Sequence, residues 1–208
     1  MAAIDHIIIG VANLDDGIRA FEAATGVSPV RGGKHPSRGT ENALVSLGDM
    51  TYLEIIAPQL DAPASDDFAG YLRTLRAPAV IGWAVRATDL DGVRTRIQEL
   101  GFTASEPKPG SRITPAGQTL EWVTFEVEQT QIATAPFFIQ WSSSTTHPSL
   151  SSPGGCTVRS FELADPQSQE LSRLLAALHV DVVVRAAERP SMDLALQCAG
   201  RQASFASQ

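Results

Sequence analysis

The chain has 208 residues, enough for one large domain or two small ones with a real hydrophobic core. Its 16 Lys and Arg residues stand against 23 Asp and Glu, and this net charge of −7 disfavours recognition of a nucleic-acid backbone. The longest apolar runs, at residues 7–9 and 136–139, are much shorter than a membrane span. We therefore expect a soluble protein with no nucleic-acid or membrane partner.

The N-terminal segment and the cysteines predict the compartment. Residues 1–3 lead directly into an apolar, β-branched segment without the basic and long apolar regions of a signal peptide, so we expect a cytoplasmic protein. Cys156 and Cys198 lie 42 positions apart, and neither has a neighbouring cysteine that would form a CxxC pair. This spacing excludes a zinc ribbon or a CxxC redox motif and favours two reduced, structural thiols.

A first group of elements covers residues 4–60. Residues 4–11 are short and rich in β-branched side chains, which predicts a buried strand. Asn13 can cap a helix over 14–24, because the apolar positions there recur at helical spacing, and Gly26 lies where this helix would end. Three further strands are predicted near 28–33, 41–48 and 51–57.

The same order of elements recurs from residue 79. Residues 79–85 form the next predicted strand, and Asp89 can cap a helix that Gly101 closes. Strands are then expected near 102–106, 118–127 and 135–141. The sequence therefore predicts two tandem βαβββ modules, at about 4–60 and 79–141, within a domain that covers residues 1–149.

The remaining residues, 150–208, predict a shortened third copy. Residues 142–155 are polar and turn-forming, so they are expected to connect the copies. A strand at 157–163, a helix that begins after Asp165 and a closing hairpin at 180–185 and 192–198 make a partial βαββ module packed on the same unit. The last residues, 201–208, are expected to fray.

Two polar side chains fall on strands that should be buried. His6 shares a strand face with Ile4 and Ile8, and an imidazole in such a place needs a hydrogen-bond partner or a metal. Glu54 lies in a strand that is apolar on both faces, where an ionised carboxylate requires a cation, a metal or a proton. A satisfied core histidine and a salt bridge from Glu54 to an arginine are the structural alternatives to a binding site.

These residues carry a resemblance to a known superfamily. Asp-His-Ile at 5–7 and Tyr-Leu-Glu at 52–54, within a repeated βαβββ unit, resemble the vicinal oxygen chelate superfamily, which includes glyoxalase I, extradiol dioxygenases and bleomycin-resistance proteins. Residues 32–54 and 136–149 resemble the glyoxalase-like branch more closely. The resemblance covers about residues 4–149. It implies an α+β fold in which the two modules form an open, curved, barrel-like mixed sheet with helices outside.

The resemblance also implies a divalent metal held in the cleft by the first and last strands of each module. The first module would supply His6 and Glu54, and the matching positions of the second are Trp83 and Gln140. Tryptophan cannot bind a metal, whereas Gln140 offers a neutral amide oxygen. His6, Glu54 and Gln140 are therefore the predicted ligands of a weakly held cation of unknown identity, unless His35 supplies the missing nitrogen.

Other residues are candidates for substrate contact. The glycines near position 33 permit turns that would bring His35, Thr40 and Asn42 to the mouth of the cleft, although turn chemistry alone also explains them. Trp83 would form either a wall of the cleft or part of the core. His147 is expected to be exposed or to cap a local turn. The predicted substrate-binding residues are Thr40, Asn42, Trp83, Gln140 and Trp141.

The leading functional prediction is a small-molecule enzyme of the isomerase or lyase type. A cleft metal would polarise vicinal oxygens of the substrate, and Glu54 or His35 would move the proton as the catalytic residue. The alternatives are a metal-free protein that binds small molecules or antibiotics, with the net charge favouring a cationic or aromatic ligand, and a structural subunit with a degenerate site. Exposed sheet edges favour a homodimer.

Overall fold

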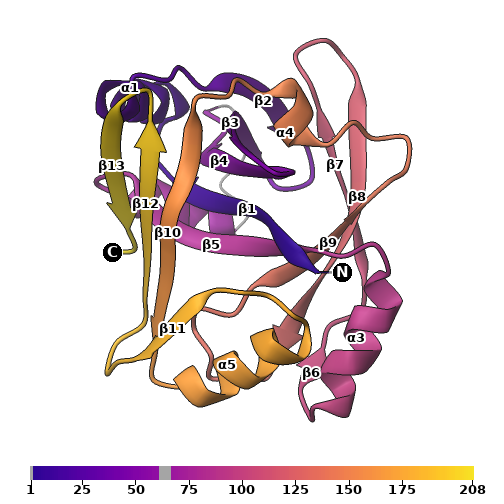
Figure 1. Cartoon of the computed structure of the whole chain (residues 1–208). Coiled ribbons are helices and arrows are strands. Elements are labelled where there is room, and N and C mark those ends of the chain that lie inside the picture. Colours follow the sequence, from indigo (N-terminus) through magenta and orange to yellow (C-terminus); the bar gives the residue numbers. More distant parts are fainter. Residues whose placement is uncertain (1, 61–66) are drawn as a thin grey trace.

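Within residues 2–60 and 67–208, which the computed structural model describes, the chain forms two β-sheets and five helices (Figure 1). The first module comprises β1 (Ala3–Gly10), α1 (Leu14–Thr25), β2 (Val30–His35), β3 (Thr40–Gly48) and β4 (Thr51–Pro58). After α2 (Asp67–Thr74), the second comprises β5 (Ala79–Arg86), α3 (Leu90–Glu99), β6 (Thr103–Ala104), β7 (Lys108–Ile113), β8 (Thr119–Glu128) and β9 (Phe137–Trp141). The C-terminal elements are α4 (Pro148–Ser151), β10 (Cys156–Asp165), α5 (Ser168–Ala177), β11 (Val183–Ala186), β12 (Ser191–Cys198) and β13 (Arg201–Ala206).

The larger sheet is mixed and closes into a barrel. Its strand order is β6-β8-β7-β2-β3-β4-β1-β5-β9, and β8 also pairs with β9, so the ring closes with β6 at its margin. The β2–β7 seam is held by one pairing, Lys34 with Ile113, and a Cβ at Gly33 would lie 2.0 Å from the Ile113 carbonyl oxygen. The prediction of an α+β fold with tandem βαβββ modules is confirmed, with two differences: the sheet is closed rather than open, and the second module has one strand more than predicted, because both β6 and β7 lie between α3 and β8.

Alternation along the barrel strands separates a core face from a cavity face. On β1 and β4, Ile7 and Leu53 belong to the main hydrophobic core, whereas their neighbours His6 and Glu54 line a cavity. The core is completed from outside the barrel by side chains of helices and of the smaller sheet: Phe21 of α1, Ile97 of α3, Leu171 of α5 and Leu194 of β12. The barrel and the C-terminal elements therefore share one core.

The C-terminal sheet differs from the predicted hairpin. Its order is β11-β10-β12-β13, so β11 and β12 lie on opposite sides of β10, and β11 is parallel to β10 after the α5 crossover. Strand β13 pairs with β12 where fraying was expected, because Ala199 and Gly200 form a tight turn with positive φ angles of 40° and 81°. Phe205 then stacks on Phe21 of α1, with ring centroids 5.6 Å apart. The domain boundary near residue 149 and the homodimer stay predictions.

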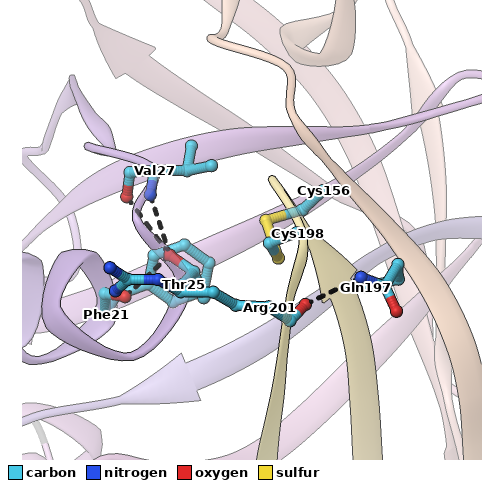
Figure 2. The surroundings of a disulfide bond; sticks show 7 residues. All are labelled: Phe21, Thr25, Val27, Cys156, Gln197, Cys198 and Arg201. Atoms are coloured by element: carbon cyan, nitrogen blue, oxygen red, sulfur yellow. Dashed lines mark hydrogen bonds between the residues drawn. A yellow bond between two sulfur atoms is a disulfide. The ribbon is translucent and has the colours of Figure 1, made fainter.

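The prediction of two reduced thiols is wrong. Cys156 and Cys198 are directly paired across β10 and β12, with Cα atoms 4.1 Å apart, and form a disulfide. Figure 2 shows this bond beside the end of α1, where the Thr25 hydroxyl donates to the Phe21 carbonyl at 2.7 Å. Sequence separation hid the pairing, because only the strand register places the two cysteines opposite each other. Stable disulfides are rare in the cytosol, so this bond gives the cytoplasmic prediction no support.

None of the helices in the described ranges combines the length and the apolar composition that crossing a membrane would require.

Candidate functional site

A cavity of about 270 Å³ lies among strands of the barrel. Alternate residues of four barrel strands, β1, β4, β8 and β9, line it, because side chains on a strand alternate between faces. Trp122, at the cavity wall, packs against Trp141 in an edge-on arrangement with ring centroids 5.1 Å apart. The lining from β1, β4 and β9 comprises His6, Ile8, Tyr52, Glu54, Ile56, Phe137, Ile139 and Trp141.

The Glu54 carboxylate is the centre of the polar groups in this cavity. Its Oε2 lies 3.6 Å from His6 Nε2, and its Oε1 lies 3.9 Å from His35 Nε2. Asn42 donates from Nδ2 to Oε1 at 2.6 Å, and Arg112 donates from Nη1 to Asn42 Oδ1 at 3.1 Å. The arginine thereby fixes the orientation of the amide, with its nitrogen toward Glu54.

The orientation of His6 is fixed from behind by Asp5. The fully buried Asp5 carboxylate accepts a hydrogen bond from His6 Nδ1 at 2.7 Å, which turns the other ring nitrogen toward Glu54. Asp5 also accepts from His147 Nε2 at 3.0 Å and from Trp141 Nε1 at 3.1 Å. His147 caps α4 as expected, but it is buried rather than exposed.

Burial and hydrogen bonding set the charges of these groups. Burial opposes the ionisation of Asp5, but the hydrogen bonds from His147 and His6 outweigh it and hold the pKa of Asp5 well below its usual range. Burial likewise opposes ionisation of Glu54, but electrostatic interactions with His6 and His35 and the hydrogen bond from Asn42 outweigh it and leave the pKa of Glu54 lowered. Burial lowers the pKa of His35 to about 4. At neutral pH both carboxylates are therefore ionised and His35 is neutral.

The structure brings five of the predicted site residues together. His6, His35, Asn42, Glu54 and Trp141 all line the cavity. His6 of the first strand and Glu54 of the last strand of the first module, which the sequence assigned to one site, are therefore neighbours in the cavity.

Three predicted site residues lie elsewhere. Trp83 pairs with Ile7 rather than with His6, so it faces the core, where its indole donates to the Thr134 carbonyl at 2.9 Å. Gln140 points away from the cavity, and its side-chain oxygen accepts from the Leu90 backbone N–H at 3.0 Å. Thr40 is fully buried and does not line the cavity. Its Oγ1 lies 3.0 Å from His35 Nδ1 and so helps to position the His35 ring.

The predicted metal ligands do not fit a metal site. Gln140 is turned away, and at the cavity the second module presents apolar groups such as Phe137 and Ile139. The nearest donor set is His6, His35 and Glu54, yet one Glu54 oxygen already accepts from Asn42. Over residues 2–60 and 67–208, no group of three or more His, Cys, Asp or Glu is placed to hold a metal ion.

This donor geometry predicts weak binding of divalent cations. For protein treated with a chelator, we expect about 1 mM Mn²⁺, Ni²⁺, Zn²⁺ or Mg²⁺ to raise the Tm by less than about 2 °C, as for a millimolar site. Thermal unfolding followed by circular dichroism measures the shift. An increase of 5 °C or more at about one equivalent of a single ion would show that a metal site assembles here after all.

Sequence reasoning missed the residues that support the site from other parts of the chain. The sequence indicates Asp5 and Tyr52 only as members of the motifs that contain His6 and Glu54, and it indicates no role for Arg112. The burial of Tyr52 raises its pKa well above the ordinary value, and its ring stacks on His6 with centroids 4.7 Å apart. The alternation of β4 could have identified Tyr52, which is two residues from Glu54. No local signal identified Arg112, which reaches Asn42 across 70 positions.

Comparisons with known proteins agree with this architecture. A hypothetical protein from Staphylococcus aureus is similar over 100% of this chain and 86% of its own, with a TM-score of 0.66 and 17% identity. One from Bacillus halodurans covers 70% of this chain and 98% of its own, with a TM-score of 0.51 and 15% identity. Methylmalonyl-CoA epimerase from Mycobacterium tuberculosis covers 66% and 85%, with a TM-score of 0.48 and 22% identity. The structural similarity to the two hypothetical proteins, at identities below 25%, establishes the fold alone.

No curated protein sequence matches the chain. The model of a family described as "Glyoxalase-like domain" matches residues 4–179, which include both modules, the cavity and the first part of the C-terminal sheet. The predicted resemblance to the glyoxalase-like branch of the vicinal oxygen chelate superfamily is therefore confirmed, and the protein belongs to the glyoxalase-like domain family.

Proposed function

We propose that the protein is a small-molecule enzyme of the isomerase or lyase type in which Glu54 moves a proton at a carbon next to a carbonyl group. The observation that carries this proposal is the position of the Glu54 carboxylate. It is buried, lines the cavity and lies between the Nε2 atoms of His6 and His35. Such a carboxylate can act as a general base on a bound substrate.

The neighbours of Glu54 suit proton transfer. Asn42 holds one carboxylate oxygen, and the Asp5 hydrogen bond fixes the His6 ring. A proton that Glu54 takes from the substrate carbon can return to the same carbon, or it can pass to His6 or to the neutral His35. Return to the opposite face of the same carbon inverts its configuration, whereas delivery to another atom isomerises the substrate or expels a leaving group. No step of this mechanism requires a metal.

The cavity walls restrict the substrate to a small molecule with an apolar or aromatic part. Tyr52, Trp122, Phe137 and Ile139 all contribute to the lining. Such walls exclude water, which strengthens the interaction of the polar groups with a bound carbonyl compound.

The test is exchange of substrate hydrogen for deuterium. Wild-type protein in deuterium oxide is incubated with a panel of α-hydroxyketones and 2-oxo acids with aliphatic or aromatic side chains, and proton NMR follows the hydrogens next to the carbonyl. We expect catalysed exchange with at least one compound, and Glu54→Gln should slow it by about 100-fold or more.

The matched control is Glu99→Gln, because Glu99 is an exposed partner of Arg96 on α3 and lies outside the cavity lining. This variant should exchange at the wild-type rate. Exchange by folded Glu54→Gln at the wild-type rate, or no catalysed exchange with any compound of the panel, would refute the proposal.

The aromatic lining also suits a second function, which is metal-free binding without turnover. The Trp122–Trp141 pair at the wall can hold a flat ligand without any chemistry at Glu54. For a binding protein, Glu54→Gln changes ligand affinity in a titration, but no compound shows catalysed exchange. Exchange and titration measurements on the wild type and on Glu54→Gln therefore distinguish the two functions.

A further inference from the structure

Arg112 is a buried cation that has no acidic partner within ion-pair distance in the described part of the chain. It lies on β7, is 3% exposed and lines the same cavity as Glu54. Within residues 2–60 and 67–208, no carboxylate oxygen lies within 4.0 Å of the Arg112 guanidinium, and its one side-chain hydrogen bond is to Asn42. Arginine stays protonated in proteins, so the full positive charge is present at the cavity wall.

The remaining N–H groups of Arg112 are open to the cavity. Its guanidinium has five N–H donors, and Asn42 uses one. Among the described residues, no fully buried side-chain nitrogen or oxygen lacks a hydrogen-bond partner, so the unused guanidinium nitrogens are not sealed inside the protein. They are reached from the cavity that Arg112 lines.

The backbone beside Arg112 leaves room for this side chain. A Cβ at Gly32 would lie 2.1 Å from Arg112 Nη1 and 2.4 Å from Asn42 Oδ1. Any residue other than glycine at position 32 would therefore displace the guanidinium and break its bond to Asn42. The glycine that the sequence presented as a turn residue thus gives Arg112 its place beside the cavity.

The charge around the cavity is opposite in character to the net charge of the chain. Arg38 and Lys108 also line it, so among the described residues of the lining three permanent cations stand beside two acidic residues, Glu54 and Glu126. A buried guanidinium is normally paired with a carboxylate or a phosphate, and its planar donor array binds a carboxylate through two parallel hydrogen bonds. The cavity therefore offers a place for a negatively charged ligand, whereas the net charge of the sequence suggested a cationic one.

We propose that Arg112 binds the carboxylate of the substrate, so that this site takes small carboxylic acids with an apolar or aromatic part. This inference rests on the proposed function, because it supplies the substrate class for the carbon acid on which Glu54 acts. The carboxylate would take the open donors of Arg112, the aromatic lining would hold the hydrocarbon part, and Glu54 would face a carbon between them.

The test uses three ligands of similar size that differ in charge, and none of them needs to react. The ligands are 3-phenylpropanoate, 3-phenylpropanamide and 3-phenylpropylammonium, titrated by calorimetry. We expect the wild type to bind the carboxylate at least about 10-fold more tightly than the amide or the ammonium ion. Arg112→Gln should remove this preference, and Arg112→Lys, which keeps the charge without the planar donors, should retain part of it.

The control is Arg189→Gln, which removes a cation that is exposed and outside the cavity lining, and which should keep the wild-type preference. The ranking of the three ligands by the wild type decides the question even where Arg112→Gln fails to fold. Equal or tighter binding of the amide or the ammonium ion by the wild type, or an unchanged preference in folded Arg112→Gln, would overturn the inference.

Glu54→Gln separates this inference from the proposed function. That variant should still prefer the carboxylate, because it retains Arg112, while deuterium exchange is lost. A carboxylate preference without exchange in the wild type would leave the Arg112 site standing and refute the enzyme. Catalysed exchange without a carboxylate preference would support the proposed enzyme and refute the Arg112 site.

Discussion

Replacing Cys156 and Cys198 together with alanine is expected to lower the free energy of unfolding by about 4 kcal/mol. The disulfide closes a loop with a sequence separation of 42, and the bond restricts the unfolded chain much more than the folded one. Both cysteines are buried, so alanine adds no unsatisfied polar group. For a domain of this size the loss corresponds to a fall in Tm of about 8–16 °C.

Denaturation by urea, followed by circular dichroism, measures this loss. Wild-type protein under a reducing agent should unfold at nearly the same urea concentration as the double variant, and the reducing agent should leave the variant itself unchanged. If reduction does not shift the wild-type transition, the disulfide does not contribute to stability. The cavity lies in the barrel rather than at this bond, so ligand affinity of the folded double variant should match the wild type.

Asp5→Asn is expected to lower the free energy of unfolding by about 3 kcal/mol or more at neutral pH. The buried carboxylate accepts hydrogen bonds from His6, His147 and Trp141. An asparagine replaces one acceptor oxygen with an NH₂ group, which cannot accept a hydrogen bond from these donors. The same change frees the His6 ring that faces Glu54, so we expect the exchange rate to fall by about 10-fold to 100-fold.

The pH dependence of this loss follows from the lowered pKa of Asp5. A carboxyl whose pKa is lower in the folded than in the unfolded protein stabilises the fold fully above its unfolded value, about 3.9, and loses that contribution as the pH falls through the folded value. The difference in the free energy of unfolding between the wild type and Asp5→Asn should therefore have its largest value above about pH 5 and should decrease as the pH falls below that.

Urea denaturation at several pH values checks this expectation, with Asp15→Asn as the matched control. Asp15 makes a largely exposed ion pair with Arg31, and losing it should cost less than about 1 kcal/mol at any pH. Equal stability losses in the two variants would mean that the buried Asp5 network does not stabilise the protein.

The module pattern and the central pair of the site could be predicted from the sequence. The apolar neighbours of His6 and Glu54 are local features, so the sequence places both residues on buried strands. Helix caps such as Asn13 and Asp89 likewise mark where the helices begin. The physical need of a buried carboxylate for partners then predicted a polar cluster around Glu54, and the structure contains it.

The register of the second module could not be predicted in this way. Antiparallel β1 and β5 pair with irregularities after Ile4 and after Ile8, and a shift of one residue moves a side chain to the opposite face of a sheet. Trp83 therefore faces the core although its position in the repeat matches that of His6. Gln140 also lies on the face of its strand opposite to the cavity, whereas its neighbours Ile139 and Trp141 face the cavity.

The sequence by itself determined the repeated modules, the family and the pair of residues at the centre of the cavity, because periodicity and local motifs carry that information. Only the tertiary structure decided the partners of that pair. Arg112 meets Asn42 across 70 positions, and His147 meets Asp5 across 142. Contacts of this kind depend on barrel closure and strand register, which are set by the packing of the whole chain rather than by any local pattern.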